Sequence, residues 1–89
     1  MADWLGAFVG EQVVIDTDAG YLAIGVLEQA AADHVVLTAC DLHDHAEANS
    51  TKEVYVLESR RFGPRVNRQR VVLPRSRVVA VSRLVDAVS

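Results

Sequence analysis

The stretch Val13–Leu27 reads V-V-I-D-T-D-A-G-Y-L-A-I-G-V-L and decides the fold that this sequence predicts. Two apolar runs rich in β-branched residues flank D-T-D-A-G, which predicts two antiparallel strands joined by a tight turn. Gly20 stands where such a turn needs a positive φ, and the aspartates before it can hydrogen-bond their own backbone. Gly25 lies inside the second strand, where glycine marks a bend, a bulge or a close backbone approach. A hairpin with a bent second strand is what a small, strongly curved barrel requires.

The rest of the chain continues the strand pattern on both sides of one polar interruption. A short helix over 3–9, capped by Asp3, is expected to close one end of the barrel with its apolar face. The segment from about 41 to 67 is a variable excursion, in which the V-Y-V-L run of Glu53–Phe62 favours a strand. The prediction is therefore an all-β open barrel with a short N-terminal helix and five strands, or six if Glu53–Phe62 adds one. The predicted strands are Gln12–Thr17, Tyr21–Gln29, His34–Leu42, Glu53–Phe62, Arg68–Leu73 and Arg77–Ser82.

Length and composition predict one domain, 1–89, that assembles with copies of itself. Of its 89 residues 51% are hydrophobic, and the predicted strands are apolar on both faces. One face packs the core, so the other needs a cover, which we expect a partner subunit to supply. Cys40 is the only cysteine and lies in an apolar run, so we expect a buried thiol in a reducing compartment. Neither a signal peptide nor a membrane span is recognisable, which predicts a cytoplasmic protein.

Charge is divided unevenly between the two halves of the chain. Residues 1–51 hold nine acids and no Lys or Arg, whereas residues 52–89 hold nine bases against three acids. Such asymmetry favours contact with nucleic acid, but it equally favours pairing of acidic and basic surfaces within or between subunits. The candidate basic cluster surrounds the Gly63-Pro64 turn and consists of Arg60, Arg61, Arg65, Arg68 and Arg70.

Catalytic and metal-binding chemistry find little support in the sequence. Asp41, His43 and His45 would share a face of an extended segment and could ligate zinc, but a loop rich in Asp and His is more often simply solvated. No nucleophile stands beside a base in a recognisable motif, and no glycine-rich phosphate loop is present. We therefore expect no enzyme activity, no metal site and no cofactor.

Two stretches of the sequence resemble the two sequence motifs of the Sm/LSm family. The first runs L-x-x-F-V-G-E-x-V-V-I from Leu5 and continues to Gly20, Gly25 and Leu27 with the spacing G-x-x-x-x-G-x-L. The second is V-V-L-P-R-S-R-V-V-A-V at Val71–Val81, and together they cover about 4–41 and 68–82. The resemblance implies a bent five-stranded open barrel and a ring of roughly five to seven copies joined by pairing of edge strands. An SH3-like monomer is the structural alternative.

The resemblance also implies an RNA site, at which this sequence departs from the family pattern. Asp33 corresponds to the family's aspartate but stands about two residues late, and the asparagine that reads uracil is missing. His34 could stack on a base or donate a hydrogen bond to it, but it is not the residue that the family uses to read the base. Arg75 takes the place of the arginine of the second motif, with Ser76 instead of glycine after it. The RNA-binding candidates are Asp33, His34, Arg75 and Arg77. The alternative is a homo-oligomeric structural or protein-interaction ring without RNA binding, in which arginines pair with acidic neighbours.

Overall fold

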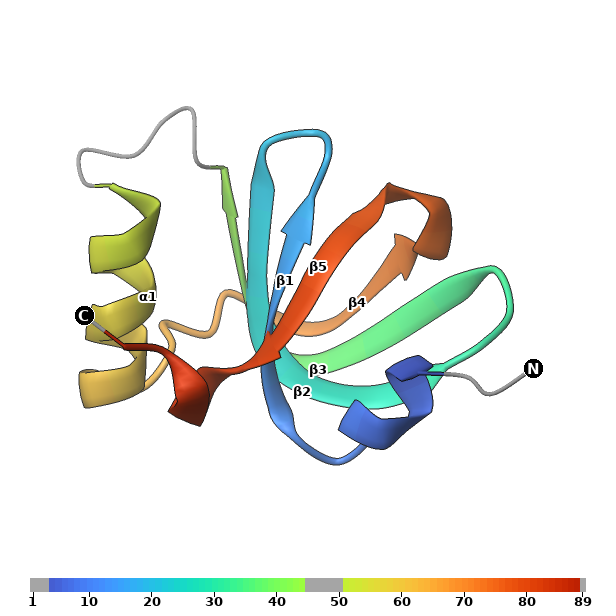
Figure 1. Cartoon of the computed structure of the whole chain (residues 1–89), viewed down its shortest axis with the longest axis horizontal. Helices are drawn as coiled ribbons and strands as arrows, with labels where there is room; N and C mark the ends of the chain where they lie inside the picture. Colours follow the sequence, from blue (N-terminus) through green and yellow to red (C-terminus); the bar gives the residue numbers. More distant parts are fainter. Residues whose placement is uncertain (1–3, 45–50, 89) are drawn as a thin grey trace.

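The computed structural model describes residues 4–44 and 51–88 and gives the chain as a single bent sheet with one α-helix outside it (Figure 1). Asp3 and His45, which entered the interpretation of the sequence, lie outside the described residues. The strands are β1 (Gln12–Thr17), β2 (Tyr21–Ala30), β3 (His34–Asp44), β4 (Arg68–Pro74) and β5 (Val78–Arg83). The helices are η1 (Trp4–Phe8), α1 (Lys52–Phe62), η3 (Arg75–Arg77) and η4 (Leu84–Asp86), all except α1 being short 3₁₀ turns.

The five strands are antiparallel and follow the order β4-β3-β2-β1-β5. The strands β4 and β5 are therefore the two edges of the sheet, although only η3 separates them in sequence. In Figure 1 the long strands β2 and β3 curl round so that the sheet forms an open barrel. This topology confirms the predicted five-stranded barrel.

Gly25 is the point at which the hairpin bends. A Cβ placed there would lie 2.9 Å from the carbonyl oxygen of Thr38 and 3.1 Å from the Cα of Cys40, so no side chain fits. The pairing of β2 with β3 shifts register at Gly25, between Ile24 and Val26, and again between Leu27 and Gln29. Ala39, on β3 opposite this bend, has a φ of 48°. Gly20 has a φ of 83°, as the turn requires. Both glycines act as the sequence predicts.

The inside of the barrel holds the main core. It contains nine buried residues from η1 and from four of the strands: Leu5, Val13, Ile15, Ala23, Leu27, Val35, Leu37, Cys40 and Val71. The turn η1 closes one end with Leu5, and the backbone beyond it is tied to β2 by Gly10 N–H donating to the carbonyl of Leu27 at 2.8 Å. The predicted helix over 3–9 is thus a 3₁₀ turn over Trp4–Phe8 with the expected capping role.

The predicted strand over Glu53–Phe62 is wrong, because this segment forms α1. The side chain of Thr51 caps the helix by accepting from Val54 N–H, and Gly63 with a φ of 87° ends it. Glu53 lies in the first turn, and Arg60 with Arg61 in the last, which complements the helix dipole. The V-Y-V-L run therefore adds no sixth strand, and its apolar residues serve a helix face instead.

Helix α1 covers part of the second face of the sheet, which we call the outer face. A second cluster of buried residues lies there, formed by Val14, Leu22, Ile24 and Leu84, with Tyr55 and Val56 of α1 packed against it. The cover that the sequence assigned to a partner subunit is thus supplied here by α1 and η4 of the same chain. Exposed valines remain on the two edge strands: Val72 on β4 is 58% exposed and Val79 on β5 is 65% exposed. Among the described residues, no helix is long and apolar enough to cross a membrane.

Candidate nucleic-acid interface

The turn between β2 and β3 lies against η3 at one end of the barrel. Ala31 N–H donates to the carbonyl of His34 at 2.9 Å and closes the turn. The backbone N–H of Arg75 donates to the carbonyl of Asp33 at 2.9 Å, and its guanidinium donates to the carbonyl of Ala31 at 2.7 Å. Three of the four sequence-predicted residues, Asp33, His34 and Arg75, are thereby brought together.

Asp33 and His34 form a hydrogen-bonded pair at the tip of this turn. Nδ1 of His34 lies 2.6 Å from Oδ1 of Asp33, and the side chains are 39% and 89% exposed, respectively. The hydrogen bond from His34, helped by its charge, lowers the pKa of Asp33 below its ordinary value. The carboxylate orients the imidazole, which leaves a part-exposed aromatic ring at the surface.

Arg75 and Arg77 turn in different directions from η3. The Arg75 guanidinium is part-buried against the β2–β3 turn, as its bond to Ala31 shows. Arg77 instead faces the β1–β2 turn, where its Nη1 lies 3.4 Å from Oδ1 of Asp18 and Asp18 N–H donates to its carbonyl. Arg77 is therefore not part of the group formed by Asp33, His34 and Arg75.

The solved structures of other proteins include chains with this architecture. No family model matches the chain, and no curated protein matches it by sequence. Among solved structures, the Pyrococcus abyssii Sm protein in complex with a uridine heptamer is similar over 92% of this chain and 99% of its own, with a TM-score of 0.60 and 15% identity. This chain has the Sm fold. A chain in the crystal structure of the NatC complex bound to CoA is also similar, over 91% of this chain and 84% of its own, with a TM-score of 0.57 and 16% identity.

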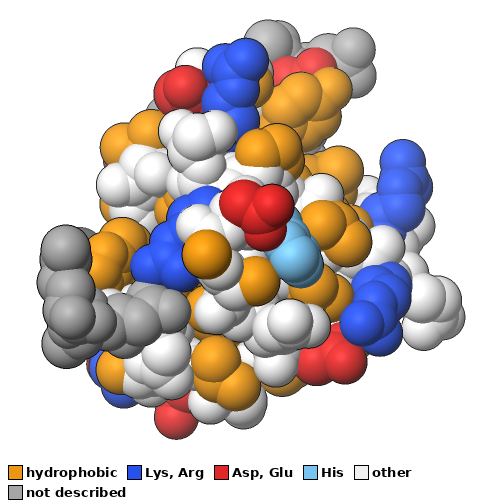
Figure 2. Space-filling view, turned by 90° about the vertical axis from the view of Figure 1, so that its right-hand side faces the viewer, with side chains coloured by type: hydrophobic (Ala, Val, Ile, Leu, Met, Phe, Trp, Pro, Cys, Tyr) orange, Lys and Arg blue, Asp and Glu red, His pale blue; other side chains and the backbone are white. Residues whose placement is uncertain are grey.

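The five arginines of the candidate basic cluster are spread over the outside of this Sm fold. Arg60 of α1 donates to the carbonyl of Ala87, and Arg61 lies over the ring of Phe62. Arg65 lies between α1 and β4, Arg68 donates to the carbonyl of Asn67, and Arg70 pairs with Glu28 at 3.2 Å. In Figure 2 basic, acidic and apolar side chains are interspersed on the face shown. The basic side chains on that face do not merge into one continuous surface.

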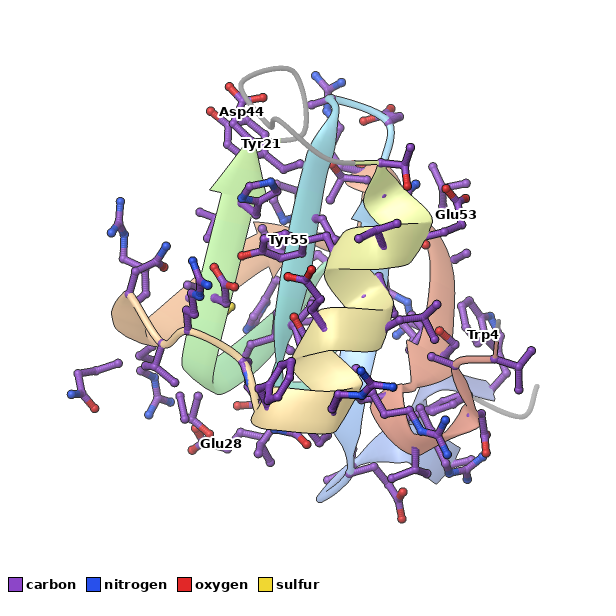
Figure 3. The ribbon with its side chains drawn as sticks, turned by 90° about the vertical axis from the view of Figure 1, so that its left-hand side faces the viewer. Trp4, Tyr21, Glu28, Asp44, Glu53 and Tyr55 are labelled. Carbon is purple, nitrogen blue, oxygen red and sulfur yellow. The ribbon has the colours of Figure 1, made fainter. Side chains whose placement is uncertain are left out.

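Asp41 and His43, considered as metal ligands, belong instead to an anchor that holds α1 against β3. Asp41 is 2% exposed and accepts a hydrogen bond from the hydroxyl of Tyr55, while the ring of His43 stacks on Tyr55 at 3.9 Å between centroids. Figure 3 shows Tyr55 pointing from α1 toward β3. Burial, and then the bond to Asp41, raise the pKa of Tyr55 above its ordinary value, so the phenol stays protonated. Within the described part of the chain, no group of three potential ligands could hold a metal ion.

Asn67 completes the anchor and has no counterpart among the residues that the sequence singled out. Its side-chain amide pairs with the backbone of Leu42, accepting from the N–H and donating to the carbonyl, each at 3.0 Å. Its Nδ2 also lies 3.4 Å from the Asp41 carboxylate. Nothing in a single asparagine within a basic segment would have predicted this role.

A pocket of about 600 Å³ opens along β4. Leu73 and Pro74 line it from β4 and Leu42 from β3, with Tyr21 on the side of the β1–β2 hairpin. It adjoins the strand edge at which the sheet could accept a further strand. The sequence offered no signal for it, because its lining comes from four separate segments.

Proposed function

We propose that this protein is a non-catalytic, Sm-type homo-oligomer that binds single-stranded RNA at the corner formed by the β2–β3 turn and η3. The observation that carries the proposal is the grouping of Asp33, His34 and Arg75 there. It gains support from the similar structure of an Sm protein in complex with a uridine heptamer. A single buried thiol, Cys40, suits a reducing compartment such as the cytoplasm.

The expected assembly is a ring of roughly five to seven copies, in which β4 of one copy pairs with β5 of the next. These strands are the two edges of the sheet, and each carries an exposed valine. Because the two edges differ, the contact is head-to-tail, and each copy uses both edges when the ring closes. A ring repeats the RNA corner once per subunit, so weak individual contacts add up to a strong one.

At each corner the exposed ring of His34 would stack on a base, and Arg75 would supply positive charge for the phosphate backbone. Asp33 orients the imidazole through their hydrogen bond. Because the asparagine of the family pattern is missing, we expect stacking and charge to dominate, with little preference for uracil.

The test measures the solution mass by light scattering and the binding of uridine and adenine heptamers by fluorescence anisotropy, at low and moderate salt. We expect a mass several times that of the monomer, and binding of both RNAs that weakens as salt rises. His34→Ala should weaken binding roughly tenfold without changing the mass, since stacking on one base contributes about 1–3 kcal/mol. Unchanged RNA affinity in an intact His34→Ala oligomer would contradict this site.

A second candidate function is a protein-interaction ring without RNA binding. Several arginines pair with acids of the N-terminal half: Arg70 with Glu28, Arg77 with Asp18, and Arg83 with Glu11. These pairs favour the interpretation that the basic half serves the protein itself. The similar chain in the NatC complex belongs to a protein assembly, which also suits this candidate. An intact oligomer that binds neither heptamer at low salt would select it.

A further inference from the structure

The two edge strands carry complementary features on the outer face of the sheet. On β4, the register pairs Val72 with Val36 and Arg70 with Thr38, while Val71 between them points into the barrel core. Alternate residues of a strand face opposite sides, so Arg70 and Val72 lie on the outer face. Val72 is 58% exposed, as is the side chain of Arg70. The Arg70 guanidinium pairs through one nitrogen with Glu28 of the same chain at 3.2 Å, and its five N–H donors allow it to bind a second carboxylate as well. This edge therefore presents an apolar and a cationic side chain together.

On the opposite edge, a pocket of about 290 Å³ lies between α1 and β5. Its floor is Val14 with Ser82, which are Cα partners in the pairing of β1 with β5 and lie on the outer face. Its walls come from α1 and from the chain after β5. The lining residues are Val14, Asp16, Lys52, Glu53, Val56, Leu57, Ser82, Ala87 and Val88.

The rim of this pocket is acidic on balance. Lys52 forms an ion pair with Asp16. Among the described residues that line the pocket, the exposed Glu53 is then the carboxylate that has no basic partner. In Figure 3 Glu53 projects from the side of α1 on which β5 lies. The pocket thus has apolar walls and a negative charge at its mouth, matching the valine and the arginine of β4.

We propose that α1 is part of the contact between copies: when β4 of a second copy pairs with β5, its Val72 and Arg70 pack into the pocket between α1 and β5. The proposal rests on the proposed oligomer and adds a helix to its interface. Paired strands lie about 4.8 Å apart, and opposite Cβ atoms about 4.5–5.5 Å apart. A side chain of β4 opposite Ser82 therefore reaches the pocket, with Val72 against the apolar floor and Arg70 beside Glu53.

Cysteine cross-linking tests this contact directly. The variant Glu53→Cys/Arg70→Cys is treated with a short bifunctional maleimide and compared with Glu58→Cys/Arg70→Cys as the matched control. Glu58 is an exposed glutamate of the same helix that does not line the pocket. The native Cys40 is fully buried and does not interfere. We expect a ladder of covalent multimers from the first variant and none from the second.

Three outcomes overturn the proposal, and they separate it from the proposed oligomer. If the unmodified protein is a multimer but neither variant gives a ladder, the oligomer stands and the contact with α1 is wrong. Equal ladders from both variants show contact without the proposed geometry and also refute it. An unmodified protein that is monomeric at all concentrations refutes both the contact and the oligomer. As a second readout, Val72→Lys should shift the mass toward the monomer, because a charge would enter the apolar pocket.

Discussion

Replacing Tyr55 with phenylalanine removes one oxygen from the anchor between α1 and the sheet. The Tyr55 hydroxyl donates to the carboxylate of Asp41, which is 2% exposed. Phenylalanine keeps the ring that His43 stacks on and removes only the donor. Among the described side chains, the Asn67 amide at 3.4 Å would then be the remaining donor to Asp41.

The burial of Asp41 determines how much stability the substitution should cost. A hydrogen bond to a charged group contributes roughly 1.5–3 kcal/mol, and a buried carboxylate left short of donors costs a comparable amount. Because Asp41 is buried, we expect Tyr55→Phe to lower the free energy of unfolding by about 2 kcal/mol. For a domain of this size, that corresponds to a fall of roughly 8–16 °C in Tm.

The assay is urea unfolding followed by circular dichroism at one fixed protein concentration, since any oligomer would make the midpoint depend on it. Tyr21→Phe is the matched control, because Tyr21 is 42% exposed and has no described hydrogen bond from its hydroxyl. It should change stability by less than about 0.5 kcal/mol. A Tyr55→Phe effect within that same range would refute the view that Asp41 anchors α1.

Three further outcomes follow from single residues. Gly25→Ala should cost roughly 1–3 kcal/mol in a urea titration, since its Cβ would meet the backbone of Thr38 at 2.9 Å, whereas Gly6→Ala, with open space around it, should cost far less. Burial raises the pKa of Cys40 from 9.0 to about 11. The thiol of the unfolded chain therefore loses its proton near pH 9, whereas the thiol of the folded chain keeps it until about pH 11. The free energy of unfolding should be independent of this thiol below pH 9 and should fall by roughly 2 kcal/mol between pH 9 and pH 11. Unfolding midpoints that do not change over this range would contradict the prediction. Finally, His34→Ala should return the pKa of Asp33 toward 3.8, measured by NMR titration of its carboxyl carbon, because the hydrogen bond from His34 is the main cause of its lowered value.

The barrel was predictable because its signals are local and strong. The turn at Gly20 and the bend at Gly25 each follow from steric demands that only glycine meets, and both are met as expected. The segment Glu53–Phe62 was misread because V-Y-V-L has high β-propensity, which tertiary packing overrides. Helix signals were nevertheless present: a threonine cap at Thr51, a glutamate in the first turn, and Gly63-Pro64 after the last.

The candidate site was predictable only in part, because spacing does not determine where long side chains point. The resemblance between motifs indicated Asp33, His34 and Arg75, and the adjacency of the β2–β3 turn and η3 brings them together. Arg77 stands two residues from Arg75 but pairs with Asp18, which lies in the turn after the neighbouring strand β1. Such pairings depend on the sheet order, which the charge pattern of the two halves cannot reveal.

Helix α1 covers the middle of the outer face and so limits where a second copy can bind. A sheet that is apolar on both faces needs a cover on each, and from the sequence we expected a partner subunit to supply the second one. Here α1 covers Val14, Leu22 and Ile24, while Val72 and Val79 stay exposed on the edges. Self-association is therefore not needed to cover the middle of the sheet, and the apolar side chains that remain exposed lie on its edge strands. An assembly built on this chain should accordingly use edge strands, with the helix beside β5 deciding which strand fits there.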